Sequence, residues 1–180
     1  MNKKQPKQRW EILKDLVDEI GAVRIAEIGV KKGETSLFLI KNCPKIETYL
    51  LIDPIIHHSF YQEAAFIKST VFMKMKSEQA FNLIQDGSLD LVFIDGAHDY
   101  GNVRIDIQGW LPKVRKGGIL CGHDYGQRTV VRNKRCLIEV TEAVDRYIGR
   151  ENIEVIADIN GLNSSREVDK NRAVWIYRVK

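Results

Sequence analysis

Two apolar runs of this sequence each end in a group of carboxylate and imidazole side chains. The side chains that follow the two runs are Asp95, His98, His123 and Asp124. In an open sheet built from alternating strands and helices, ligands bind just outside the carboxyl ends of the strands. Two neighbouring strands that end in this way therefore predict one site that combines metal ligands with acid–base groups.

The members of this group divide into two expected roles. Asp95, His123 and Asp124 form a ligand set that suits Mg²⁺, or Mn²⁺ because of the nitrogen ligand. His98 follows closely after Asp95, where a neutral imidazole can remove a proton from an acceptor hydroxyl near neutral pH. A lone histidine is more often structural or exposed, but four such groups at two strand ends favour the functional interpretation.

A second pattern is a strand that runs into a glycine turn and then into a helix, at residues 27–35. Gly29 and Gly33 allow the backbone to approach a ligand closely, and the start of the helix presents free N–H groups. The Gly-x-Gly-x-x-Gly pattern of dinucleotide sites is missing, and Glu27 would repel a pyrophosphate but suit a ligand with an ammonium group. An ordinary strand-to-helix turn explains this pattern equally well.

Further polar residues follow the second and third expected strands. Asp53 can accept hydrogen bonds from ribose hydroxyls, and the nearby glycine turn favours this role over a simple turn before proline. Ser77 and Glu78 start the next helix, where Ser77 is either its N-cap or a contact to a purine ring. Asp99 and Asp106 are interpreted as a helix-start residue and as a solvated or capping acid.

Hydrophobic patterning predicts that strands and helices alternate along the chain. Strands are expected at residues 23–28, 46–52, 71–75, 89–94, 118–121, 153–157 and 173–179. Helices are expected at residues 10–20, 34–42, 59–68, 78–85, 102–114 and 137–148. Nearly continuous apolar strands between helices indicate an α/β fold with a mostly parallel sheet covered on both faces. The polar linker 158–172 is typical of a hairpin loop, so the last strand is expected to be antiparallel.

Composition limits the class of protein. The 180 residues fit a single domain, with an N-terminal helix at 1–21 and a core at 22–180. No apolar run is long enough to span a membrane, and the basic N-terminus continues into an amphipathic helix, so we expect a cytoplasmic protein. A net charge of +4 without an aromatic-interleaved basic face argues against nucleic-acid binding. Three widely spaced cysteines, Cys43, Cys121 and Cys136, argue against a disulfide framework.

Taken together, the region 23–179 resembles the class I S-adenosylmethionine-dependent methyltransferases. The resemblance is closer to a small bacterial group with an Asp-Gly-x-His-x-Tyr signature, here residues 95–100, and a later Gly-Gly…His-Asp-Tyr element, here residues 117–125. It implies a three-layer, Rossmann-like fold whose seven-stranded sheet is mostly parallel with an antiparallel last strand. It also implies that the glycine turn holds the methionine part of S-adenosylmethionine and that Asp53 holds the ribose.

The sequence is also similar to the metal-dependent O-methyltransferases of the catechol and caffeoyl-CoA type. Asp95, His123 and Asp124 fall at the magnesium-ligand positions of those enzymes, and His98 falls where the catechol enzymes carry a catalytic lysine. The residues implied to bind the cofactor are Glu27, Gly29, Gly33, Asp53, Ser77, Glu78 and Asp95. The histidine at 123 departs from the aspartate of that family, so the resemblance leaves Mg²⁺ and Mn²⁺ both open.

The expected function is metal-assisted O-methylation of a small hydroxylated acceptor, either a sugar or an aromatic diol. The segments 57–65 and 126–134 are expected to form walls of the acceptor site, and the basic residues at 128–135 suit either a solvated loop or an anionic acceptor. Two alternatives are a nucleotide-dependent oxidoreductase, disfavoured by Glu27 and the missing third glycine, and a non-catalytic module that binds the cofactor or a partner protein. The sequence does not decide the oligomeric state, and a homodimer is one option.

Overall fold

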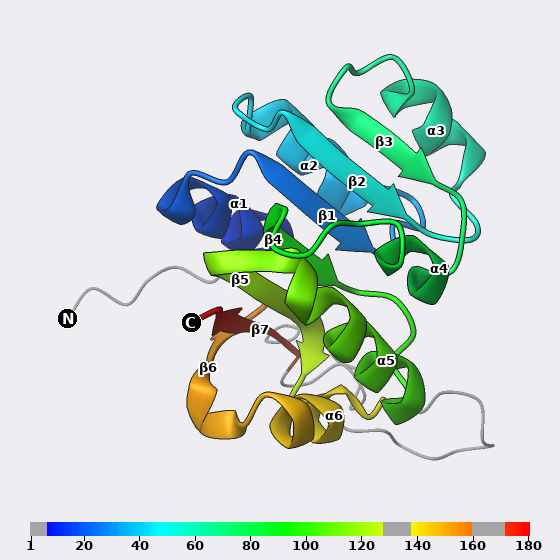
Figure 1. The fold of residues 1–180 in the computed structure, drawn as a ribbon. Coiled ribbons are helices and arrows are strands. Elements are labelled where there is room, and N and C mark those ends of the chain that lie inside the picture. Colours follow the sequence, from blue (N-terminus) through cyan, green and yellow to red (C-terminus); the bar gives the residue numbers. More distant parts are fainter. Residues whose placement is uncertain (1–6, 128–137, 160–171) are drawn as a thin grey trace.

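The computed structural model describes residues 7–127, 138–159 and 172–180 of the chain, and within them the strands form a single sheet (Figure 1). The strand order is β3-β2-β1-β4-β5-β7-β6, and β7 runs antiparallel to both of its neighbours. The strands are β1 (Arg24–Ile28), β2 (Thr48–Ile52), β3 (Thr70–Met73), β4 (Leu89–Ile94), β5 (Val114–Tyr125), β6 (Ile153–Ala157) and β7 (Ala173–Arg178). The expected mostly parallel sheet with an antiparallel last strand is therefore confirmed.

Helices cover both faces of the sheet and give the fold three layers (Figure 1). The α-helices are α1 (Arg9–Ile20), α2 (Glu34–Asn42), α3 (His58–Ala64), α4 (Ser77–Phe81), α5 (Tyr100–Trp110) and α6 (Val140–Tyr147). Two short 3₁₀ helices are η1 (Leu111–Lys113) and η2 (Arg150–Asn152). In the described ranges, no helix combines the length and the apolar character that crossing a membrane requires.

The two faces of the sheet bury separate hydrophobic clusters. Because successive side chains of a strand point to opposite faces, Leu91 and Phe93 of β4 pack with α1, α2 and α3, while Val92 and Ile94 pack with α4, α5 and α6. Such a strand must be apolar at every position, which explains why β4 is a continuous apolar run. Cys121 is a buried thiol of the first cluster, and Cys136 lies outside the described residues.

The element boundary that differs most from the sequence prediction is that of β5, and the helices α3, α4 and α5 each end four residues earlier than predicted. The strand β5 begins at Val114 and continues to Tyr125, beyond the predicted residues 118–121. Its polar end is drawn into the sheet because it pairs with β7, where Tyr125 lies opposite Ala173. This pairing is a long-range contact that local sequence patterns do not report. Helix α4 ends at Phe81, four residues before its predicted end.

The register of the parallel strands places the ends of four strands at the same level. Ile28 of β1 pairs with Ile52 of β2 and with Ile94 of β4, and Ile94 pairs with Gly122 of β5. The residues that follow these positions therefore start at one edge of the sheet, and they are Gly29, Asp53, Asp95 and His123. The register thus supplies the geometric basis of a site at this edge.

Candidate active site

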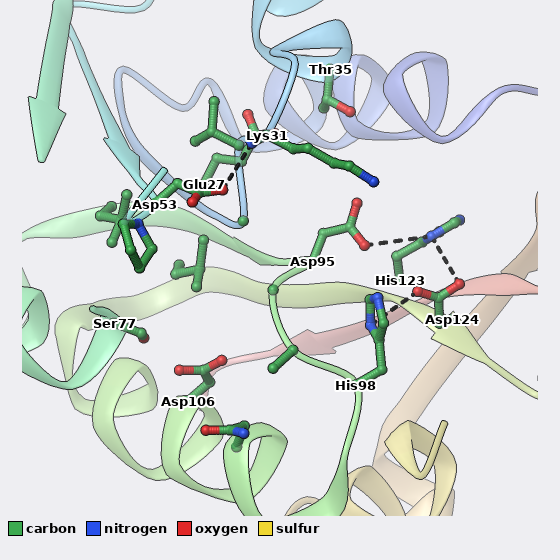
Figure 2. Close-up of a pocket in the computed structure, with 18 of the residues that line it drawn as sticks. Glu27, Lys31, Thr35, Asp53, Ser77, Asp95, His98, Asp106, His123 and Asp124 are labelled. Carbon is green, nitrogen blue, oxygen red and sulfur yellow. Dashed lines mark hydrogen bonds and ion pairs between the residues drawn. The ribbon is translucent and has the colours of Figure 1, made fainter. Parts of the chain in front are cut away.

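A pocket of about 900 Å³ opens at the carboxyl edge of the sheet. Every site residue predicted from the sequence lines it, namely Glu27, Gly29, Gly33, Asp53, Ser77, Glu78, Asp95, His98, His123 and Asp124. Figure 2 shows Asp53, Ser77 and Asp106 on one side of the pocket and Asp95, His98, His123 and Asp124 on the other. The pocket therefore has one end rich in imidazole and carboxylate groups and another end formed by the strand-end residues of β2 and β3.

The glycine turn after β1 requires glycine for steric reasons. Gly29 has a φ of 91°, and a Cβ atom at this position would lie 2.2 Å from the backbone oxygen of Asp95. Gly33 has a φ of 74°, and its Cβ would lie inside the ring of Phe60. Both positions combine a left-handed backbone with no space for a side chain, so the turn packs closely on the residues after β4 and on Phe60 of α3.

Asp53 connects the end of β2 to the glycine turn. Its Oδ2 accepts a hydrogen bond from the backbone N–H of Lys31 at 2.9 Å, and its Oδ1 accepts one from the backbone N–H of Ile55 at 2.8 Å. The carboxylate thus stabilises the local turn, and it also lines the pocket. Its contact to a ribose stays a prediction.

Glu27 is a buried acid beneath the glycine turn. Its Oε2 accepts hydrogen bonds from the Ser36 hydroxyl at 2.6 Å and from the Tyr49 hydroxyl at 2.5 Å. Burial raises the pKa of Glu27 to about 7, although these two hydrogen bonds oppose the shift. A cationic ligand group beside Glu27 would favour its ionised form, so the site suits an ammonium group better than an anion.

Asp95, His98 and Asp124 come together at the other end of the pocket. One ligand atom from each of these residues lies within 4.8 Å of the others, and this is the group of the described residues that could hold a metal ion. Nδ1 of His98 lies 3.2 Å from Oδ2 of Asp124 (Figure 2). Burial raises the pKa of Asp95. At Asp124 burial also acts to raise the pKa, but the hydrogen bond with His123 and the charges of His123, His98 and Arg172 together outweigh it and lower the pKa.

His123, predicted as a metal ligand, lies next to this group but is not a member of it. Its Nε2 lies 2.9 Å from Oδ2 of Asp158, and its Nδ1 faces Oδ1 of Asp124 at 3.4 Å and Oδ1 of Asp95 at 3.7 Å. Burial alone would lower the pKa of His123, but the hydrogen bonds with Asp124 and Asp158 outweigh it and raise the pKa to about 9. The ring is therefore an imidazolium at neutral pH, with both nitrogens facing carboxylates.

Three charged residues of the site were missed from the sequence. One is Arg172, whose Nε lies 3.9 Å from Oδ1 of Asp124, and the other two are Arg9 and Asp158. Arg9, the first residue of α1, places Nη1 3.6 Å from Oδ2 of Asp95 and donates from Nε to the Thr35 hydroxyl at 3.1 Å. Asp158 follows β6 and is buried against His123. Arg9 and Asp158 both lie far in sequence from the ends of β4 and β5, and only the tertiary packing brings them here. The only local signal at Arg9 is its place at the start of a helix.

Two sequence interpretations change at the other end of the pocket. Helix α4 begins at Ser77, so Ser77 is not the N-cap but accepts a hydrogen bond from Nε1 of Trp110 at 2.8 Å. Asp106, expected to be a solvated or capping acid, lines the pocket and is only 4% exposed. Asp99 is the N-cap of α5, as predicted, and its side chain accepts from the backbone N–H of Asn102.

The two segments that we expected to form walls of the acceptor site lie only partly within the described residues. The residues at 57–65 do not line this pocket, so their expected role as an acceptor wall is wrong for this pocket, and Phe60 packs instead against Gly33. Gly126 and Gln127 belong to the described residues, whereas 128–134 lie outside them. The pocket is lined instead by Arg9, Ile55 and Arg172, which no sequence pattern singled out.

Replacing Asp106 by asparagine is expected to stabilise the protein at high pH. Burial raises the pKa of Asp106 from 3.8 to about 6, so ionisation costs the folded state more than the unfolded state. The penalty grows as pH rises from about 4 to 6 and is then constant at about 3 kcal/mol, because a raised acid pKa favours folding only while the group is protonated. Melting temperatures of Asp106→Asn and the wild type should therefore diverge at pH 8 and converge toward pH 4.

The matched control for this measurement is Asp99→Asn. The hydrogen bond with Asn102 lowers the pKa of Asp99, so this carboxylate contributes stability above its unfolded pKa and loses it as pH falls. Its asparagine variant should be no more stable than the wild type at pH 8. Equal melting temperatures for Asp106→Asn and the wild type across the whole pH range would contradict a buried, ionised Asp106.

A family model described as a methyltransferase domain matches residues 26–125, which is more than half of the chain. The chain belongs to this methyltransferase family. The resemblance to the class I S-adenosylmethionine-dependent methyltransferases is thereby confirmed, and so is the Rossmann-like methyltransferase fold. Membership favours methyl transfer over the oxidoreductase alternative.

Solved structures agree with the fold. The cofactor-bound structure of Rv0187 from MTB is 17% identical with a TM-score of 0.71, and the match covers 100% of this chain and 84% of that one. The O-methyltransferase TomG from Streptomyces achromogenes, in complex with SAM, is 16% identical with a TM-score of 0.69, covering 96% and 80%. The O-methyltransferase from Bacillus cereus, in complex with SAH, is 18% identical with a TM-score of 0.65, covering 96% and 80%. At these identities the likeness extends to the fold alone.

A curated relative, the uncharacterised protein y4gI of Sinorhizobium fredii, is 26% identical over 72 residues. This match covers 40% of the present chain and only 8% of the length of y4gI. It therefore relates one part of the chain to a much larger protein and carries no information on substrate.

Proposed function

We propose that this methyltransferase transfers the methyl group of S-adenosylmethionine to a hydroxyl of a small acceptor, assisted by Mg²⁺ or Mn²⁺. The observation that carries the proposal is the cluster of Asp95, His98 and Asp124 at one end of the pocket. Two carboxylates and an imidazole beside a cofactor pocket provide what O-methylation needs, namely a cation site and a base.

The pocket fits S-adenosylmethionine in size and in chemistry. About 900 Å³ exceeds what a molecule of that size fills, so space remains for an acceptor next to the methyl group. We assign the methionine part to the glycine turn, with Glu27 facing its ammonium group, and the ribose to Asp53. Ser77 and Glu78 lie further along the same edge, at the expected place of the purine. When bound, the sulfonium supplies an already activated methyl group.

The two carboxylates fit a divalent ion that keeps several water or acceptor ligands. Mg²⁺ is often held by one or two carboxylates, and Asp95 and Asp124 provide them. When bound, such an ion would lower the pKa of an acceptor hydroxyl. Because both nitrogens of His123 face carboxylates, we assign it the role of a buried cation that holds Asp95 and Asp124 in place.

His98 is assigned the role of general base. Donation from its Nδ1–H to Asp124 would fix the tautomer and leave the lone pair on Nε2 for the acceptor proton. With S-adenosylmethionine bound, Nε2 of His98 would take the acceptor's hydroxyl proton, and the sulfonium would supply the methyl group to the acceptor oxygen and keep the C–S bond electrons. The backbone oxygen of His98 accepts a hydrogen bond at 2.8 Å from the N–H of Glu139, which is the N-cap residue of α6. This hydrogen bond connects the loop that carries His98 to α6.

The proposed acceptor, a sugar or an aromatic diol, follows from the same combination of a cation site and a base. A sugar or an aromatic diol offers two neighbouring hydroxyls, of which one can approach the cation and the other the base. Arg9 and Arg172 lie beside the two carboxylates, at 3.6 Å from Oδ2 of Asp95 and 3.9 Å from Oδ1 of Asp124, so two guanidinium groups border the proposed acceptor site.

A calorimetric titration with S-adenosylmethionine tests the proposed function first. We expect saturable binding, a separate Mn²⁺ isotherm, and methylation of catechol as a simple diol probe. Gly29→Val is the matched control, because its side chain would collide with the Asp95 backbone and close the cofactor turn. No binding of S-adenosylmethionine to the wild type, with or without Mn²⁺, would overturn the proposal.

A further inference from the structure

Arg172 is a largely buried cation that the proposed chemistry does not use. It immediately precedes β7, lines the pocket, and its side chain is 22% exposed. Its backbone oxygen accepts a hydrogen bond from the N–H of Asp158 at 3.2 Å, so the end of the β6–β7 pair holds it at the pocket wall. A guanidinium group carries five N–H donors, and a buried donor that is left without an acceptor is costly for stability.

The described residues leave donors of Arg172 unused. Its Nε is buried and has no hydrogen-bond partner among the residues that the structure describes. Oδ1 of Asp124 lies 3.9 Å from this nitrogen, which is too far for a hydrogen bond. Arg9 differs, because its Nε donates to the Thr35 hydroxyl and its two Nη atoms each face a carboxylate. Of these two guanidinium groups, Arg172 is therefore the one with donors available for a ligand.

Arg172 and His98 face the same carboxylate through different oxygens. Nδ1 of His98 lies 3.2 Å from Oδ2 of Asp124, whereas Nε of Arg172 faces Oδ1. Figure 2 shows Asp124 next to His98 at the wall of the pocket that Arg172 also lines. A small acceptor whose hydroxyl meets His98 can therefore reach Arg172 with a second polar group.

The charges around Arg172 indicate that this second group is a carboxylate. The imidazolium of His123 faces both Asp95 and Asp124, so these two acids already share a buried cation. A planar carboxylate can accept two parallel hydrogen bonds from a guanidinium group. A phosphate dianion at the same place would be repelled more strongly by Asp124 than a singly charged carboxylate, because Coulomb repulsion grows with charge.

We infer that Arg172 binds a carboxylate of the acceptor and makes the enzyme selective for hydroxylated acids over neutral hydroxylated compounds. The inference rests on the proposed function. Its chemistry is a carboxylate that lies near the methylated hydroxyl, which both aromatic hydroxy acids and sugar acids provide. In this recognition Nε and one Nη donate to the two carboxylate oxygens, and no covalent bond forms or breaks.

The test is a calorimetric titration of acceptor pairs into the protein saturated with S-adenosylhomocysteine. The aromatic pair is 3,4-dihydroxybenzoate and 3,4-dihydroxybenzamide, and the sugar pair is glucuronate and glucose. In at least one pair the wild type should bind the acid about 10-fold more tightly or better, since hydrogen bonds between charged groups are about twice as strong as neutral ones. The pair that shows the preference identifies the source of the carboxylate. In Arg172→Gln the affinity ratio should fall toward one.

A matched variant separates recognition from loss of charge in general. Arg178 of β7 forms ion pairs with Glu19 and Glu154 and does not line the pocket, so Arg178→Gln should keep the wild-type ratio. If Arg172 only supported Asp124, Arg172→Gln would weaken the acid and its neutral partner equally, and this outcome would overturn the inference.

Two further outcomes separate the inference from the proposed function. A wild type that binds S-adenosylhomocysteine but prefers neither acid, or binds none of the four compounds, would overturn the inference alone. A wild type that does not bind S-adenosylhomocysteine would overturn the proposed function, and this inference with it.

Discussion

Replacing Asp124 by asparagine is expected to lower kcat/KM by about 10³-fold or more, while leaving cofactor binding intact. The reason is that Asp124 has two roles in the proposed site, as a carboxylate of the cation site and as the partner of His98 at 3.2 Å. Cation assistance alone is worth several kcal/mol in a transition state, and each 1.4 kcal/mol corresponds to a tenfold change in rate.

The backbone at Asp124 makes asparagine the right substitution. Asp124 has a φ of 59°, in the left-handed region that asparagine adopts as readily as aspartate. Alanine would add backbone strain to the loss of the carboxylate and confuse the two effects. The asparagine variant removes the negative charge and keeps the shape, so a folded protein is expected.

The measurement is a Mn²⁺ titration followed by electron paramagnetic resonance, together with catechol methylation with and without Mn²⁺. The variant should lose both the bound Mn²⁺ and the stimulation by Mn²⁺. Asp99→Asn is the matched control, since asparagine is as good an N-cap as aspartate and this carboxylate caps α5 outside the cluster. Stimulation by Mn²⁺ that survives in Asp124→Asn would exclude the proposed cation site.

The position of the site at the carboxyl edge of the sheet can be predicted from sequence patterns alone. Apolar runs give the strands, and the carboxyl ends of parallel strands share one edge, so the pattern by itself places Asp53, Asp95 and Asp124 together. The register then brings Ile28, Ile94 and Gly122 level. This part of the site is predictable because successive strand–helix units, which local patterns reveal, set the order and the direction of the strands.

Two long-range contacts of the site do not follow from such patterns. Asp158 reaches His123 because Ala157 of β6 and Tyr125 of β5 both pair with Ala173 of β7, which lies between the two strands. Arg9 reaches Asp95 because α1 packs on the same face of the sheet as α2. Neither contact lies within one strand–helix unit. The protonation of His123, and so its assignment as a cation and not a ligand, depends on the local hydrogen bond with Asp124 and on the long-range hydrogen bond with Asp158.

Asp106 is different, because its burial could have been predicted. The apolar face of α5 contains Val103, Ile107 and Trp110, and Asp106 lies three residues after Val103 and four before Trp110. This spacing puts its carboxylate on the buried face of the helix. The charge of the residue led to an exposed assignment, although a charged residue at a buried position is itself the signal of a functional group.

Replacing His98 by alanine is expected to lower kcat by about 10² to 10⁴-fold, the usual contribution of a general base. The acid limb of the pH–rate profile, which reports protonation of an essential base, should disappear in the variant. Binding of S-adenosylmethionine and of Mn²⁺ should remain, because the two carboxylates of the cluster are intact. Calorimetry for both ligands and initial rates between pH 5 and 9 provide the measurement.

Added imidazole separates the base role of His98 from the ligand role that its position also permits. A free imidazole can enter the space left by the side chain, so His98→Ala should regain activity with added imidazole while its affinity for Mn²⁺ stays constant. Asp124→Asn should gain nothing from imidazole, because its missing carboxylate cannot be replaced by a base. A loss of Mn²⁺ affinity in His98→Ala that parallels its loss of rate would instead make His98 the third ligand of the cation, and another group would have to accept the proton.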